Sequence, residues 1–168
     1  MILDGLRVID RTDVKKVVAD VEQVYLSTQG VNKGLVSHFV TSEERTIPRE
    51  NALLIPRTIF DDANSDPVYL HDVVKVWVDT EDGLMYDLGI LVDDEYGMVQ
   101  LQYFNVDYIE EEIEGLFHAL DDNIWVERVC SVWDDVSLSD IMGMMLDNYS
   151  HDITYQGVFN ILSKYGIC

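Results

Sequence analysis

Three runs of alternating apolar and polar residues between positions 72 and 105 constrain the fold more than any other part of the sequence. Apolar side chains recur at every second position in residues 74–78, 86–92 and 99–103. This is the period of a β-strand, whose successive side chains point to opposite faces. The segments that join the runs are short and contain Gly83 or Gly97, which is typical of hairpins. The sequence therefore predicts an antiparallel β-meander at about residues 72–105 with one buried face.

Four other segments carry the helical spacing of apolar residues, in which side chains recur at i, i+3, i+4 and i+7. The predicted amphipathic helices cover about residues 12–28, 108–121, 138–148 and 154–165. Thr12 is a suitable N-cap for the first helix, and Asp107 with Glu110 has the capping-box arrangement for the second. Strands gathered in one part of the chain and helices in others predict an α+β fold, a meander packed with helices, rather than a wound parallel sheet.

The chain has 168 residues, of which 48% are hydrophobic, so a packed core is expected. This length predicts a single α+β domain over residues 1–168. Residues 1–57 hold eight bases and eight acids, 8 − 8 = 0, whereas residues 58–168 hold three bases and 24 acids, 3 − 24 = −21. The first subregion is charge-neutral and the second is strongly acidic, an asymmetry typical of a dedicated interaction surface.

The expected location follows from what the sequence lacks. Residues 1–15 do not contain the apolar core of a secretory signal, and no run of 18 apolar residues is present to span a membrane. Cys130 and Cys168 have neither metal-binding nor redox-motif spacing. We therefore expect a cytoplasmic protein with reduced thiols, which would act in the host cytoplasm if a phage encodes it.

Acidic residues dominate the 57 positions from Asp79 to Asp135. This stretch holds seventeen Asp and Glu but a single base, Arg128, and apolar runs are interleaved with the acids. We therefore expect a folded anionic surface rather than a disordered tail. The helix dipole accounts for acids at the start of the predicted helix 108–121, but not for Asp121 and Asp122 at its end. The candidate partner-binding residues are Asp93, Asp94, Glu95, Asp107, Glu110, Glu111, Glu112, Glu114, Asp121, Asp122, Asp134 and Asp135.

A net charge of −21 makes direct binding to nucleic acid or to an anionic membrane unfavourable, and makes a basic groove on another protein the complementary partner. A duplex about as long as a compact domain of this size, roughly 40 Å, carries about 24 phosphates. The 24 acids of residues 58–168 match that number in order of magnitude. We therefore predict a stoichiometric, phage-encoded anti-defence inhibitor of the anti-restriction or anti-CRISPR type. It would mimic nucleic-acid charge and block the nucleic-acid-binding groove of a host nuclease or of a CRISPR or restriction complex.

Two other interpretations of the acidic composition stay open. An immunity protein that neutralises a basic nuclease toxin would have the same small acidic form and the same fast, steered association. A protein adapted to high salt would explain why Asp outnumbers Glu, 21 to 11, although such adaptation should also coat residues 1–57. We also consider a homodimer, because Met142, Met144 and Met145 add apolar side chains to the predicted helix 138–148.

The sequence predicts neither an enzyme nor a metal or cofactor site. It contains no G-x-S-x-G, P-loop or H-E-x-x-H motif. Asp62, Asn64 and Asp66 have the spacing of the first three calcium-loop ligands. However, Pro67 stands where the loop needs glycine and Val73 where it needs glutamate, so the pattern fails.

Overall fold

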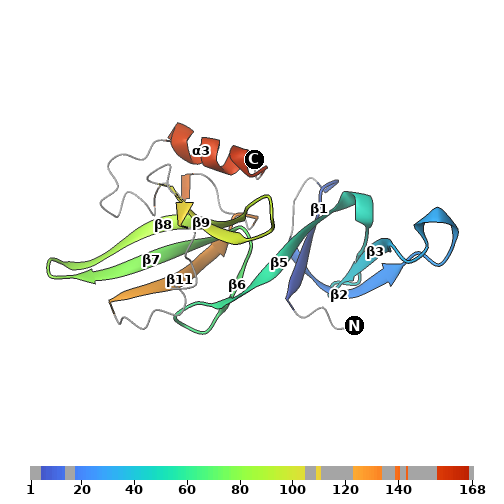
Figure 1. Ribbon diagram of the computed structural model, residues 1–168, viewed down its shortest axis with the longest axis horizontal. Coiled ribbons are helices and arrows are strands. Elements are labelled where there is room, and N and C mark those ends of the chain that lie inside the picture. Colours follow the sequence, from blue (N-terminus) through green and yellow to red (C-terminus); the bar gives the residue numbers. More distant parts are fainter. Residues whose placement is uncertain are drawn as a thin grey trace. The chain divides into compact units, whose positions relative to one another are not determined.

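The computed structural model of the chain describes residues 5–13, 18–104, 109–110, 123–133, 139–140, 143 and 155–166. Of these described residues, 57% are in strands and 15% in helices. The chain divides into two compact units, Met1–Arg57 (unit 1) and Thr58–Cys168 (unit 2), whose elements are labelled in Figure 1. The division falls inside strand β5 (Ala52–Asp61), at the same position as the change from neutral to acidic sequence. The prediction of a single domain concerns whether both units unfold together, and it stays a prediction.

Unit 1 is an antiparallel sheet. Its elements are β1 (Leu6–Asp10), β2 (Val18–Leu26), the 3-10 turn η1 (Gly30–Asn32), β3 (Val36–Thr41), β4 (Thr46–Pro48), the 3-10 turn η2 (Arg49–Asn51) and β5. The strand order is β4-β3-β2-β1-β5-β6, where β6 (Pro67–Tyr69) already belongs to unit 2. β1 pairs antiparallel with both β2 and β5, so it lies inside the sheet. Among the described residues of unit 1, one buried cluster consists of Val8, Val21, Phe39 and Ile47, and Ile9, Ala19 and Ile55 are buried as well.

The helix predicted for residues 12–28 is wrong, because residues 18–26 form strand β2. The pairing of β2 with β3 has an irregular register between Val21 and Gln23. Such a bulge shifts the alternation of side chains by one residue. Val21 is therefore buried in the core, and Val24 packs against the same core three positions later. A strand thereby acquires the i, i+3 spacing of a helix, while its β-branched valines favour the strand.

Unit 2 is built on a five-stranded antiparallel sheet with the order β10-β9-β8-β7-β11. Its strands are β7 (Asp72–Thr80), β8 (Gly83–Asp93), β9 (Val99–Tyr103), β10 (Ile109–Glu110) and β11 (Ile124–Ser131). The three strands predicted between residues 72 and 105 are present as β7, β8 and β9, and β11 returns along the outer side of β7. Figure 1 shows the β7–β8 hairpin extending away from helix α3 (Tyr155–Lys164).

The centre of this sheet is buried on both faces, so the predicted burial of one face is wrong there. On one face Val73 and Ile90 pack with Val158 of α3. On the other face Val74 and Leu91 belong to a second core, which includes residues of β5 and β6. Consecutive residues of β7 and β8 therefore point into two different cores, which explains the unbroken apolar run in β8.

The remaining predicted helices have different outcomes. The helix predicted for residues 154–165 is present as α3. The helix predicted for residues 108–121 is wrong at its start, because Ile109 and Glu110 form strand β10 and pair with β9. Residues 111–121 lie outside the described residues, as does most of the predicted helix 138–148, of which 139–140 and 143 are helical.

The predicted α+β class, a meander packed with four amphipathic helices, is therefore wrong. The described chain is mostly antiparallel sheet, in which pairing along β2 and β10 replaces helix. The physical reason is that neighbouring strands supply hydrogen-bond partners to the backbone N–H and C=O groups that face them, and this pairing overrides local helical spacing.

Candidate functional site

The structure describes four of the twelve predicted partner-binding residues. Asp93 ends β8, Asp94 and Glu95 lie in the connection to β9, and Glu110 is the second residue of β10. The other eight lie outside the described residues: Asp107, Glu111, Glu112, Glu114, Asp121, Asp122, Asp134 and Asp135. Asp93, Asp94 and Glu95 therefore lie at a hairpin tip, as the sequence predicts, whereas Glu110 belongs to a strand and not to the predicted helix face.

Asp94 has a structural role in the β8–β9 connection. Its Oδ1 accepts hydrogen bonds from the backbone N–H groups of Tyr96 and Met98, both at 2.8 Å. This is the local side-chain-to-backbone pattern by which aspartate builds turns. Asp93 and Glu95 are exposed on either side of it. This tip of the sheet therefore presents two acids to solvent, while the third organises the loop.

A second acidic tip lies at the opposite end of β8. Asp79, Glu81 and Asp82 flank or form the β7–β8 turn, and all three are exposed. Strand β8 has 11 residues. At about 3.4 Å per residue, its two ends are roughly 34 Å apart. The exposed acids of the described sheet are therefore gathered at two distant ends and not in one patch.

Arg128, the single base between Asp79 and Asp135, is turned into the protein. Its Nε donates to Asp72 Oδ2 at 2.6 Å and its Nη2 to Asp72 Oδ1 at 3.4 Å. The Asp72 side chain is fully buried and also accepts a hydrogen bond from the Tyr69 backbone at 2.9 Å. Paired donation of this kind satisfies a buried carboxylate. The charge of Arg128 is thus matched inside the protein and does not offset the surface acids.

Asp62 closes the β5–β6 turn and does not form part of a calcium loop. Its Oδ1 accepts hydrogen bonds from the backbone N–H groups of Asn64 at 2.8 Å and Asp66 at 2.9 Å. Its Oδ2 accepts one from the Arg128 backbone at 2.9 Å. The carboxylate is therefore occupied by main-chain donors. Among the described residues, no group of three or more His, Cys, Asp or Glu could hold a metal ion.

Three aromatic side chains form a row across neighbouring strands of the sheet. Trp77 of β7 stands directly opposite Tyr86 of β8 and Trp125 of β11. The centroids of the Trp77 and Tyr86 rings are 4.7 Å apart, and the Trp77 and Trp125 rings lie 6.2 Å apart with planes at 16°. Trp77 Nε1 donates a hydrogen bond to Glu127 Oε2 at 2.7 Å. We call Trp77, Tyr86 and Trp125 the aromatic row.

The other two bases of unit 2 lie over aromatic rings. Lys75 Nζ is 4.5 Å from the centroid of Tyr86 and 5.4 Å from that of Trp77. Lys164 Nζ is 5.4 Å from the centroid of Tyr165. These distances are within the range of cation–π attraction. Each of the three bases in residues 58–168 therefore has a partner within the protein.

Burial shifts the pKa of two further groups in unit 2. His71 lies in the turn between β6 and β7, where its Nδ1 accepts a hydrogen bond from Trp133 Nε1 at 3.1 Å. Burial lowers the pKa of His71, and the nearby charge of Asp93 partly opposes that change. Burial raises the pKa of Asp87. Burial thus favours the neutral form of each group relative to the unfolded chain, so both make the stability depend on pH.

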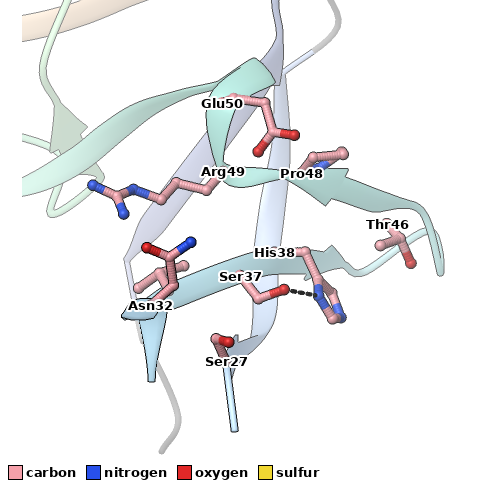
Figure 2. Close-up of a pocket in the computed structure, with 9 residues that line it drawn as sticks. Ser27, Asn32, Ser37, His38, Thr46, Pro48, Arg49 and Glu50 are labelled. Atoms are coloured by element: carbon pink, nitrogen blue, oxygen red, sulfur yellow. Dashed lines mark hydrogen bonds between the residues drawn. The ribbon is translucent and has the colours of Figure 1, made fainter. Parts of the chain in front are cut away.

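Unit 1 contains a pocket of about 590 Å³ between the β2–β3 connection, β3, β4 and η2. Figure 2 shows the polar side chains that line it, which include Asn32, Ser37, His38, Arg49 and Glu50. Ser37 Oγ lies 3.1 Å from His38 Nδ1, and the His38 ring stacks on Tyr25 at 4.6 Å. The lining combines one arginine with one glutamate, so its charge is balanced like that of unit 1 as a whole.

Sequence reasoning does not find the aromatic row or this pocket. A tight β7–β8 hairpin already implies that Trp77 faces Tyr86, since Thr80 pairs with Gly83. Trp125 joins them only because β11 pairs with β7, and no local pattern encodes a pairing between strands so far apart in the chain.

Comparisons of the chain with protein-family models, with curated proteins and with solved structures find no match. In the part of the chain that the structure describes, no helix is long and apolar enough to cross a membrane. The functional interpretation therefore depends on the chemistry of the two units.

Proposed function

We propose that the chain is a non-enzymatic binding protein whose acidic unit 2 occupies the basic nucleic-acid-binding groove of another protein and blocks it stoichiometrically. The form that we propose is a phage-encoded anti-defence inhibitor. Its partner would be a restriction or CRISPR nuclease in the host cytoplasm, where nucleic-acid enzymes of this kind act.

The observation that carries the proposal is the coincidence of the charge boundary with the boundary between the units. Residues 1–57 have a net charge of 8 − 8 = 0 and residues 58–168 one of 3 − 24 = −21. The compact units cover the same two ranges. The excess of acidic residues therefore belongs to one folded unit. An adaptation that spreads negative charge over the whole chain would not explain this confinement.

The intramolecular partners of the three bases strengthen this argument. Arg128 pairs with buried Asp72, and Lys75 and Lys164 lie over rings. A unit of this kind repels nucleic acid but attracts a groove that binds it, and complementary charge accelerates the encounter. Binding would release counterions from the groove, as nucleic acid does, so the affinity should fall steeply as salt rises.

The positions of the exposed acids also fit an elongated groove. The two acidic tips lie at opposite ends of β8, roughly 34 Å apart at the usual rise of a strand. A duplex of about that length carries about 20 phosphates along its axis. Acids at both ends of the sheet would contact two separate parts of a groove built for a duplex.

Affinity capture from a host lysate, with the intact chain as bait, tests the proposal. We expect basic nucleic-acid-binding proteins to be captured and to be released by added duplex DNA. We also expect release when salt is raised from about 50 mM to about 200 mM, the range over which contacts with phosphate-binding grooves weaken strongly. Capture that neither DNA nor salt affects would contradict the proposal.

A pair of charge variants provides the control. The first bait neutralises four of the exposed acids at the tips by Glu81→Gln, Asp82→Asn, Asp93→Asn and Glu95→Gln. The second bait makes the same change in charge on unit 1 by Glu22→Gln, Glu43→Gln, Glu44→Gln and Glu50→Gln. All eight side chains are exposed. We expect the first bait to capture much less partner and the second to capture as much as the unchanged chain.

The two other interpretations give different outcomes in the same experiment. An immunity protein would capture one nuclease toxin and leave other groove-bearing proteins in the lysate. A protein adapted to high salt would capture nothing specific, and its unfolding temperature would rise continuously into molar salt as the repulsion within unit 2 is screened.

A further inference from the structure

The aromatic row of unit 2 has no role in the charge complementarity proposed above. Trp77, Tyr86 and Trp125 stand side by side on three strands and are all partly exposed. Leu84 is 54% exposed and continues this surface toward the hairpin tip, because it lies two residues before Tyr86 on the same face. In Figure 1 this hairpin extends away from α3. Partly exposed aromatic residues are enriched among the residues that dominate binding energy at interfaces.

Lys75 demonstrates that the row accepts a cation. Glu127 stands directly opposite Lys75 in the strand register. The Lys75 ammonium nevertheless lies 4.5 Å from the centroid of Tyr86 and 5.4 Å from that of Trp77. Glu127 instead accepts the hydrogen bond from Trp77 Nε1, which holds the indole in place and adds negative charge at its edge. The ring faces therefore present negative potential in an ordered arrangement.

Exposed acids border the row on the side of the hairpin tip. Asp79 faces Leu84 in the strand register, and Glu81 with Asp82 forms the turn beyond it. A cationic side chain that approaches the row from this end passes three exposed carboxylates. The field of the acids and the faces of the rings thus favour the same kind of ligand.

We propose that the aromatic row anchors an arginine side chain of the basic partner, which stacks on the rings beside Glu127 and Asp79. The planar guanidinium stacks on aromatic faces and is more weakly hydrated than an ammonium group. Lys75 occupies the ring faces in the unbound protein and moves aside when the partner docks. This inference rests on the proposed function, because it names the group of the partner that one part of unit 2 receives.

A hexa-arginine peptide is the probe, titrated into the intact chain while tryptophan fluorescence is recorded, with hexa-glutamate as the negative control. We expect hexa-arginine to change the emission of the row and to bind more weakly as salt rises. A chain that does not bind hexa-arginine at all would refute the proposed function. Binding that does not depend on the row would overturn this inference and leave the proposed function standing.

Tyr86→Leu and Tyr96→Leu form the first matched pair of variants. Each removes one phenol ring from an acidic part of unit 2, but Tyr96 is 82% exposed in the β8–β9 connection, outside the row. We expect Tyr86→Leu to raise the Kd for hexa-arginine about two- to fivefold, the contribution of an exposed cation–π contact. Tyr96→Leu should leave the Kd unchanged. Equal effects of the two variants would overturn the inference.

Lys75→Ala and Lys164→Ala form the second pair, which keeps the test decisive if Tyr86→Leu does not fold. Each removes one positive charge and the contacts of one lysine with aromatic rings from unit 2, but Lys164 lies on α3 over Tyr165. If net charge alone determined the affinity, both variants would bind hexa-arginine more tightly, and by the same factor. Because Lys75→Ala also vacates the row, we expect it to lower the Kd about twofold further. Equal Kd values for the two lysine variants would overturn the inference.

Discussion

Unit 1 and unit 2 of this chain handle charge in opposite ways. Unit 1 pairs acids with bases near its surface: Arg7 lies 3.1 Å from Asp20, and Arg45 pairs with both Asp13 and Asp10. Unit 2 turns its bases toward a buried carboxylate or an aromatic ring, and the acids at both tips of its sheet are exposed. One unit therefore has a field that cancels over short distances, and the other has a field that extends into the solvent.

The unit that concentrates the charge also has the larger core. Repulsion among like charges destabilises a compact state. In the part of the chain that the structure describes, the sheet of unit 2 has apolar clusters on both of its faces, and each is larger than the cluster of unit 1. Burial on both faces offsets the repulsion, since each buried aliphatic side chain contributes about 1.5–3 kcal/mol.

Asp72→Ala should have the largest effect on stability. The Arg128 side chain is 25% exposed, and the substitution removes the fully buried carboxylate that it pairs with. Breaking a buried pair in this way costs about 3–5 kcal/mol. Urea unfolding measures the total loss, and hydrogen exchange measures its distribution between the units. Loss confined to unit 2 would contradict the predicted single domain, whereas an equal loss in both units would support it.

Gly89→Ala should have the next largest effect. A Cβ at this position of β8 would lie 2.6 Å from Leu101 Cδ1 and 2.9 Å from the Gln102 carbonyl oxygen. Forcing a methyl group into such a packed site costs about 1–3 kcal/mol. Gly143→Ala is the control, because no heavy atom lies within 4 Å of the added Cβ. Equal unfolding temperatures for the two variants would mean that the doubly buried sheet of unit 2 is not tightly packed at its centre.

His71→Asn should remove part of the pH dependence of unit 2. Burial lowers the folded-state pKa of His71 below its ordinary value of 6.5. The unfolded chain therefore binds this proton more readily, so the contribution of His71 is complete above about pH 6.5 and is lost as the pH falls from there toward the folded-state pKa. Asparagine tolerates the positive φ of 65° at this position. As the pH is lowered through this range, the free energy of unfolding should fall less in the variant than in the unchanged chain. Identical slopes of this free energy against pH would contradict the effect assigned to His71.

Arg45→Ala should have the smallest effect, although it removes the base that pairs with two acids of unit 1. The side chains of Arg45 and Asp13 are 37% and 38% exposed. Exposed pairs contribute about 0–1 kcal/mol because water and salt screen them. The same urea titration as for Asp72→Ala measures the difference. A loss as large as that of Asp72→Ala would remove the distinction between surface pairing in unit 1 and buried pairing in unit 2.

Local sequence patterns predicted some elements of this fold correctly and others wrongly. The strands between residues 72 and 105 and the helix at 154–165 follow from periodicity within a single segment, which neighbouring strands do not disturb. At β2, a bulge imitates helical spacing. At Glu110, pairing with Leu101 of β9 overrides a capping signal. Both errors arise because strand pairing is a contact between distant segments and leaves little trace in either segment alone.

Some features of the candidate site can likewise be predicted from local sequence, whereas others depend on contacts between distant segments. Glycine-containing turns place Asp82 and Asp93 at the tips of hairpins, and this much can be predicted from a local signal. The role of Asp94 inside its loop depends on hydrogen bonds to two particular backbone groups. The aromatic row depends on the register of β7 with β8 and on the return of β11 beside β7.

The net charge of each unit is independent of folding, because 24 acids and three bases in residues 58–168 sum to −21 in any conformation. The positions of those three bases, by contrast, depend on the fold. Arg128 meets Asp72 across 56 positions of the chain because β11 pairs with β7. Lys75 lies over the aromatic row because Tyr86 stands beside Trp77. Composition sums charges without regard to place, whereas only packed strands determine which charges are matched inside the protein and which remain exposed at its surface.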